Sequence, residues 1–168
     1  MSIRPERESD RDAVFDVHAR AFGRRAEAEL VDALRARAVP QISLVADEAG
    51  LAIGHVFLSP VTIGDAAELP APMALGPLAV HPNHQRRGAG SRLVVEALER
   101  ARRAGHPLVV VLGNPAYYRR FGFVRAALHD LRYERPAPEP AFQVVALSPG
   151  ALAGRRGLVR YHAAFSSL

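Results

Sequence analysis

Cysteine and lysine are both absent from this chain of 168 residues. Without cysteine the protein can form no disulfide, no thiolate metal site and no acyl-cysteine. Without lysine it cannot form the Walker phosphate loop, whose lysine reaches the terminal phosphates of a nucleotide. The seven histidines never occur as His-Glu-x-x-His, the zinc-binding pattern of metalloproteases. These absences predict a protein that holds no metal and acts without a covalent cysteine intermediate.

Long apolar runs are also missing, and the first eight residues are too charged for a signal peptide. The sequence therefore predicts a cytoplasmic protein with no membrane partner. Its length and its 49% hydrophobic content are sufficient for one buried core, so we expect a single domain. We assign the main unit to residues 1–147, and we expect residues 148–168 to form a C-terminal extension packed on it.

All 22 basic residues are arginine, and with 17 acidic residues they leave a formal net charge of +5. The arginines are scattered among Asp and Glu, and no basic stripe carries the aromatic residues that stack on nucleic-acid bases. We therefore expect no nucleic-acid partner, and we assign a few of the arginines to a polyanionic small molecule. A function in which the arginines contact nucleic-acid phosphates is the weakest of the possible functions.

Hydrophobic periodicity predicts alternating strands and helices, and hence an α/β domain. The predicted strands cover residues 2–4, 42–46, 51–59, 73–80, 108–112, 123–126 and 142–147, and residues 158–162 alternate like a strand. The predicted helices run from a cap at Ser9 to residue 21, from 26 to 37, from 90 to 104, and briefly after Asn114. The strand at 108–112 is apolar on both faces, so we expect helices to cover both. Residues 64–72 and 133–140 are predicted loops.

The strand at 73–80 contains Gly76-Pro77, a pair that an interior strand normally avoids. Proline has no N–H for the sheet ladder and glycine packs poorly, so the pair predicts a β-bulge. Such a bulge would splay this strand away from its neighbour. The helix that follows has its apolar residues on one face and meets Gly105 at its C-terminus.

Between this strand and this helix lies Gln85-Arg-Arg-Gly-Ala-Gly90, a loop with free backbone amides. Gly88 and Gly90 let a ligand approach the main chain, and the first-turn amides of a helix have no intrahelical acceptor. With the positive end of the helix dipole, such amides are typical of a phosphate site. A dinucleotide-binding loop is excluded, because it needs a third glycine where Leu93 stands. A strand-to-helix turn without a ligand is the alternative at this point.

A second pattern, Asn114-Pro-Ala-Tyr-Tyr118-Arg-Arg-Phe-Gly-Phe123, follows the buried strand at 108–112. Together the two patterns resemble those of the GCN5-related N-acetyltransferases, Gln/Arg-x-x-Gly-x-Gly/Ala for pyrophosphate and then Asn, Tyr and Gly-Phe in that order. The gap between Asn114 and Tyr118 is one residue shorter than the commonest form in that family. The residues around both patterns are similar to the bacterial YhbS-like subgroup of predicted N-acetyltransferases.

This resemblance implies a single-domain α/β fold, with a splayed strand pair in a mixed central sheet and helices on both faces. It also implies acetyl-CoA as the acetyl donor. The splayed strand would present backbone groups to the pantetheine arm, and the amides of residues 86–91 would hold the pyrophosphate. The residues implied as cofactor-binding are Leu78, Ala79, Val80, Gln85, Arg86, Arg87, Gly88, Ala89, Gly90, Ser91 and Asn114.

The resemblance also implies that Tyr118 is the catalytic acid. A phenol with a pKa of about 10 is neutral at working pH, so it can donate a proton to the departing thiolate. Tyr117, by contrast, is expected to pack in the core. Asn114 has two compatible roles, contact with the cofactor arm and N-cap of the short helix, for which Pro115 is a suitable first residue.

The predicted activity is direct transfer of an acetyl group to a primary amine of a small-molecule or peptide acceptor. The alternative is a non-catalytic acyl-CoA-binding sensory or interaction domain, which would release no coenzyme A in the steady state. The identity of the acceptor and the formation of a homodimer stay open. The strand at 73–80 contains no acid, so the general base also stays open among Glu29, Asp47, Asp65, Glu68, His55 and His81.

Overall fold

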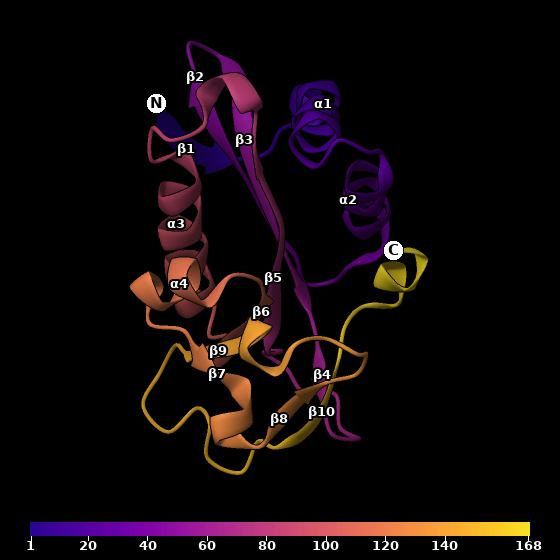
Figure 1. Ribbon diagram of the computed structural model, residues 1–168, viewed down its shortest axis with the longest axis vertical. Helices are drawn as coiled ribbons and strands as arrows, with labels where there is room; N and C mark the ends of the chain where they lie inside the picture. The colour runs from indigo at the N-terminus through magenta and orange to yellow at the C-terminus, as the bar shows by residue number, and fades with distance from the viewer.

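A seven-stranded mixed sheet runs through the computed structural model, which describes residues 1–168 (Figure 1). Its order is β1-β2-β3-β5-β6-β9-β7, and only the β5/β6 pair is parallel. The strands are β1 (Ser2–Pro5), β2 (Ile42–Glu48), β3 (Leu51–Pro60), β5 (Met73–Val80), β6 (Leu108–Leu112), β9 (Phe142–Ala146) and β7 (Val124–Arg125). A second sheet has the order β4-β10-β8 and consists of β4 (Thr62–Ile63), β10 (Gly157–Arg160) and β8 (Leu131–Tyr133). The predicted α/β fold with a mixed sheet in one domain is confirmed.

Three helices cover the N-terminal half of the large sheet, as Figure 1 shows. α1 (Arg11–Phe22) and α2 (Ala26–Arg37) lie on one face, and α3 (Ala89–Arg103) lies on the other. α1 ends at Gly23, whose φ of 70° is in the left-handed region that glycine adopts easily. None of the helices is both long enough and apolar enough to span a bilayer.

Strand β5 separates from β6 soon after it begins. The two strands pair only between residues 73–75 and residues 109–111, whereas β5 stays paired with β3 as far as Val80. A shift in the β3/β5 register places two β5 residues, Gly76-Pro77, opposite the single residue Phe57. Gly76 has a φ of 139°, a conformation that favours glycine. The splayed strand pair and its bulge therefore lie where the sequence predicted them.

The C-terminal half of the large sheet is covered differently. One face of β6 packs toward α3, but the other meets the three-stranded sheet through an apolar cluster that includes Val110, Val144 and Val159. The expectation that helices cover both faces of this strand is therefore wrong, because β4, β8 and β10 supply the second apolar surface. Beyond β10, Ala164 and Phe165 pack with residues of α1 and α2.

Some predicted boundaries also differ from the structure. Ser9 does not cap α1. A 3₁₀ turn at Glu8–Asp10 precedes the helix, and the carboxylate of Asp10 accepts a hydrogen bond from the backbone N–H of Arg7 at 2.7 Å. In the predicted strand at 123–126, only Val124–Arg125 pairs with β9. The predicted loop at residues 133–140 overlaps the last residue of β8. This strand pairs with β10, which is too distant along the chain for a local sequence pattern to reveal the pairing.

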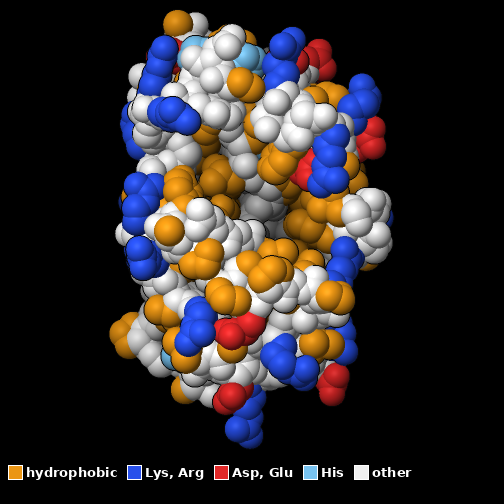
Figure 2. Space-filling view, in the orientation of Figure 1, with side chains coloured by type: hydrophobic (Ala, Val, Ile, Leu, Met, Phe, Trp, Pro, Cys, Tyr) orange, Lys and Arg blue, Asp and Glu red, His pale blue; other side chains and the backbone are white.

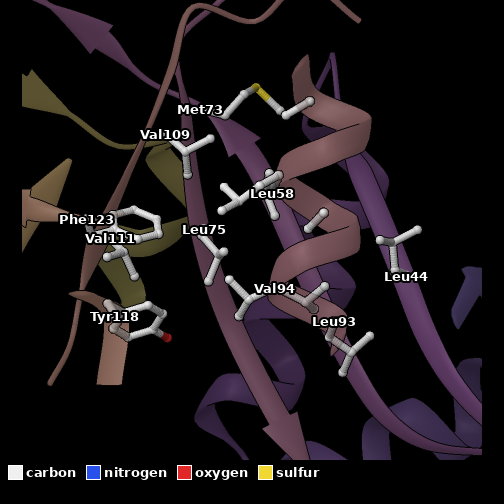
Figure 3. Close-up of a cluster of buried hydrophobic side chains, with 14 of the residues drawn as sticks. Leu44, Leu58, Met73, Leu75, Leu93, Val94, Val109, Val111, Tyr118 and Phe123 are labelled. Atoms are coloured by element: carbon white, nitrogen blue, oxygen red, sulfur yellow. The ribbon is translucent and has the colours of Figure 1, made fainter. Parts of the chain in front are cut away.

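Helix α3 supplies one side of the main hydrophobic core. Figure 3 shows Leu93 and Val94 on the side of α3 that faces Leu75 of β5, with Tyr118 and Phe123 at the far side of the same cluster. This packing follows from helical spacing, because residues three and four apart share one face. The buried residues of α3 beyond its first turn are those predicted from that spacing, namely Leu93, Val94, Ala97, Leu98 and Ala101.

We expect Leu93→Ala to lower the free energy of unfolding by about 2–5 kcal/mol, because it leaves a cavity in a fully buried site. Val95 on the same helix is 57% exposed, so Val95→Ala should change that free energy by less than about 0.5 kcal/mol. Urea unfolding followed by circular dichroism would measure both variants. Equal destabilisation by the two substitutions would contradict the assigned core face of α3.

Candidate functional site

The separation of β5 from β6 leaves a pocket of about 510 Å³ between β5, the start of α3 and the short helix α4 (Pro115–Tyr118). Figure 2 shows a hollow in the middle of the molecular face, with hydrophobic side chains on its walls. In the same orientation, Figure 1 places α3 and α4 on one side of β5 and α1 and α2 on the other. The residues that line the pocket are Leu78, Ala79, Val80, Gln85, Arg86, Gly88, Ala89, Gly90, Ser91, Tyr117 and Arg120.

The loop before α3 brings unbonded backbone N–H groups to this pocket. The amides of residues 86–91 donate no hydrogen bond within the protein, and the first helical bond runs from the N–H of Arg92 to the carbonyl of Gly88 at 3.0 Å. Arg86 has a φ of 64° and Gly88 a φ of 83°, so both are in the left-handed region. That conformation is strained for arginine, and such strain is common at ligand sites. The loop can therefore hold a phosphate group on its amides.

The side chains of the same loop differ in position. The side-chain amide of Gln85 donates a hydrogen bond to the carbonyl of Val80 at 3.0 Å and so ties the loop to the end of β5. Arg86 lines the pocket, whereas Arg87 is exposed outside it. One of the two predicted arginines therefore borders the pocket.

Tyr117 and Arg120 line the pocket. The sequence analysis placed Tyr117 in the core, against which it does pack with one side while partly buried, and it did not consider Arg120. Their side chains stack, with the guanidinium carbon of Arg120 4.6 Å from the centre of the Tyr117 ring. Arg120 also donates a hydrogen bond to the hydroxyl of Ser91 at 3.0 Å, which connects the 3₁₀ turn after α4 (Arg119–Phe121) to α3. A methyl group on Gly90 would lie 3.0 Å from the hydroxyl of Tyr117. The spacing of three between Tyr117 and Arg120 in a helical segment was the signal that could have revealed the pair.

Tyr118 lies behind this pocket wall and is 9% exposed. Its ring rests on the backbone of Gly113, where a Cβ would approach the ring to 2.5 Å, so only glycine fits there. In Figure 3 the Tyr118 hydroxyl points toward β5. Burial, together with the neighbouring Tyr117, raises the pKa of Tyr118 well above its usual range. The phenol therefore keeps its proton at neutral pH.

Asn114 begins α4, as its position before Pro115 predicted. Its side-chain oxygen accepts a hydrogen bond from the N–H of Ala116 at 2.9 Å, which makes it the N-cap. All the predicted cofactor-binding residues line the pocket except Arg87 and Asn114. The predicted catalytic residue, Tyr118, does not line it.

Most of the candidate bases are engaged elsewhere. Asp47 pairs with Arg4 at 2.8 Å, Glu68 pairs with Arg155 at 2.8 Å, and His81 accepts a backbone hydrogen bond in its own turn. No acidic residue lines the pocket. Nor is any group of three or more His, Asp or Glu side chains arranged to hold a metal ion. His55 differs from the other candidates, because it is fully buried within a chain of polar side chains.

Comparison with known proteins agrees with this geometry. The family model of the acetyltransferase (GNAT) domain matches residues 2–126. YhbS of Escherichia coli K12, an uncharacterized N-acetyltransferase, is 41% identical over 168 residues, which cover 99% of each chain.

Solved structures show the same similarity. The crystal structure of Escherichia coli YhbS in complex with CoA is 40% identical with a TM-score of 0.90, covering 98% of this chain and 91% of that one. A GNAT family acetyltransferase from Brucella melitensis in complex with acetyl-CoA is 39% identical with a TM-score of 0.79, covering 98% and 97%. The chain therefore belongs to the GNAT family of N-acetyltransferases.

Proposed function

We propose that this N-acetyltransferase moves the acetyl group of acetyl-CoA directly to a primary amine of a small-molecule or peptide acceptor. The observation that carries the proposal is the pocket between β5 and α3, where unbonded amides and a splayed strand meet. The relatives solved with CoA and acetyl-CoA share this fold over nearly the whole chain, which supports the same ligand here.

The residues present fit coenzyme A. The amides of residues 86–91 would donate to the pyrophosphate, and the positive end of the α3 dipole favours the same charge. Arg86 and Arg120, which both line the pocket, would neutralise the phosphates. Because β5 no longer pairs with β6 beyond Leu75, its later backbone groups on that side, apart from the carbonyl of Val80 that Gln85 bonds, are free to bond the pantetheine amides.

Tyr118 would be the proton donor of the reaction. Acetyl-CoA supplies the thioester, whose cleavage requires a proton for the departing sulfur. The raised pKa of Tyr118 keeps the proton on its Oη until that step, and Gly113 lets the ring lie close to the backbone. Tyr117, which lines the pocket, would instead hold the ligand and the side chain of Arg120 in position.

The first test concerns the phosphate-binding loop. Gly88→Glu would place a negative charge at the pocket, so we expect the affinity for CoA to fall about tenfold or more. Gly150→Glu is the matched control, because Gly150 also has a positive φ, of 76°, and no atoms within 4 Å of its Cβ position. Calorimetric titration with CoA would measure both variants. Equal affinity in the two folded variants would remove the loop from the site.

The second test separates the two tyrosines. Tyr118→Phe keeps the packing of the ring but loses the proton, so kcat should fall by about 10²-fold or more while the Kd of CoA stays unchanged. Tyr117→Phe should affect mainly the Kd of CoA and the KM of acetyl-CoA, because its hydroxyl lies beside Gly90 in the pocket. Titration calorimetry and initial rates measure these constants. A loss of kcat in the Tyr117 variant alone would assign the acid to that residue.

The third test addresses direct transfer and the acceptor. With no cysteine in the chain, Ellman's reagent reports only the released CoA, so a panel of primary amines can be screened without background from the protein. We expect turnover with at least one amine and intersecting lines in double-reciprocal plots, because both substrates bind before the acetyl group moves. Parallel lines or a stoichiometric burst of thiol would contradict direct transfer. CoA binding without turnover on any amine would favour a non-catalytic binding domain.

A further inference from the structure

Gln143 is the only polar residue of β9, whose sequence is otherwise apolar. It lies directly across from Val111 of β6, and the two residues of such a pair share one face of the sheet. That face packs into the main core, and Gln143 is only 1% exposed. A buried amide without partners would be costly, so the hydrogen bonds of Gln143 indicate what it does.

The side-chain amide of Gln143 holds the backbone that follows β6. Its Nε2 donates to the carbonyl of Gly113 at 3.2 Å and to the carbonyl of Ala141 at 3.3 Å. The backbone N–H of Gly113 donates to the same Ala141 carbonyl at 2.9 Å. The peptide groups on the two sides of the Gly113 Cα are therefore both tied to the start of β9.

Gly113 in turn determines where the ring of Tyr118 lies. A Cβ on Gly113 would be 2.5 Å from Cε2 of that ring and 3.1 Å from Cδ2, so the ring rests directly on the Gly113 backbone. Phe123 meets the ring edge to face with the two centres 5.6 Å apart, and Tyr117 does so at 4.9 Å. The ring is thus positioned by packing against one backbone segment and two aromatic side chains.

The hydroxyl of Tyr118 has no hydrogen bond that would fix its position. It bonds to no group of the protein, yet unlike the hydroxyl of Tyr161 it is not fully enclosed. Its location relative to β5 therefore follows from that of the ring, and hence from that of Gly113. A proton donor must lie within hydrogen-bond reach of the atom that takes the proton, so even a small displacement of the ring slows the transfer.

We propose that Gln143 is a positioning residue for acetyl transfer, because it fixes the Gly113 backbone and thereby the Tyr118 hydroxyl. This assignment rests on the proposed role of Tyr118 as the proton donor. Gln143 does not line the cofactor pocket, so it acts on the reaction only through the residues that it positions. An apolar side chain would satisfy the core at this point, as Val145 does on the same face. It would leave the carbonyl of Gly113 without its partner.

The main test uses Gln143→Met, which keeps the length of the side chain but removes both of its hydrogen bonds. With a primary amine that the wild-type enzyme acetylates, we expect kcat to fall about tenfold or more, because a shift of about 1 Å near a reacting group is costly. The Kd of CoA should not change, since no residue of the cofactor pocket is altered. Initial rates and calorimetric titration measure the two constants. If that variant does not fold, Gln143→Leu makes the same apolar replacement with a branched side chain.

Two control variants separate positioning from a general loss of structure. In Gln41→Met the lost side chain also donates from Nε2 to two backbone carbonyls, those of Arg35 at 3.1 Å and Ala38 at 2.7 Å, but these lie at the end of α2. Val109→Ala removes part of a fully buried side chain from the core face of β6. Both variants should keep kcat within about threefold when it is measured well below the melting temperature. A loss of kcat in either control equal to that in Gln143→Met would mark the effect as structural.

A double-mutant cycle shows whether the effect passes through the hydroxyl of Tyr118. If Gln143 acts by positioning that hydroxyl, little should be left to lose once Tyr118→Phe has removed it. Gln143→Met should then lower kcat by less than about threefold in the Tyr118→Phe background, although it lowers kcat about tenfold or more in the wild type. The same loss in both backgrounds would overturn the proposal, and so would a wild-type kcat in the folded Gln143→Met variant.

A structural measurement depends neither on the acceptor nor on the identity of the acid. A crystal structure of Gln143→Met with CoA should show the Tyr118 Oη displaced by about 1 Å relative to β5, while the amides of residues 86–91 stay in place. An unmoved ring would overturn the proposal even if kcat falls. A displaced ring together with a wild-type kcat in Tyr118→Phe would refute the proton donor of the proposed function and leave the positioning of the ring by Gln143 standing.

Discussion

The parting of β5 from β6 is the constraint on which the rest of this structure depends. A parallel pair that stayed in register would use its backbone groups in the ladder and would close the space between the strands. The bulge at Gly76-Pro77 redirects β5 while β3 still holds its other edge. One edge of the strand is therefore stabilised by the sheet and the other is left to bind a ligand. The large sheet remains stable because β9 pairs with β6 on its far side.

Helix α3 contributes both to the hydrophobic core and to the ligand-binding pocket. Its apolar face packs against β5 in the main core, so the start of the helix is held close to the splayed strand. The amides that precede its first intrahelical bond are unbonded, as the first N–H groups of any helix are, and most of their residues line the pocket. Packing of the helix body thus fixes the position of its phosphate-binding end. Loop strain at Arg86 is tolerated because the flanking strand and helix are rigid.

The buried polar groups are arranged by a different principle. A histidine removed from water is stable only when it is neutral and hydrogen-bonded. His18 and His55 satisfy each other, and Ser43 connects them to a carboxylate that Arg35 neutralises. Nδ1 of His18 departs from this pattern, as do the hydroxyls of Ser59 and Tyr161. Unsatisfied buried groups are rare in folded proteins.

The sequence alone determined the features that depend on neighbouring residues. Helical spacing identified the buried face of α3, Asn114 and Pro115 identified the start of α4, and Gly76-Pro77 identified the bulge. Only the tertiary structure decided which distant residues meet. It placed Tyr117 in the pocket and Tyr118 behind it, and it joined His18 to His55. The small sheet that covers β6 could not be predicted from the sequence for the same reason. Periodicity and turn chemistry act over a few residues, whereas contacts between remote segments arise only when the whole core packs.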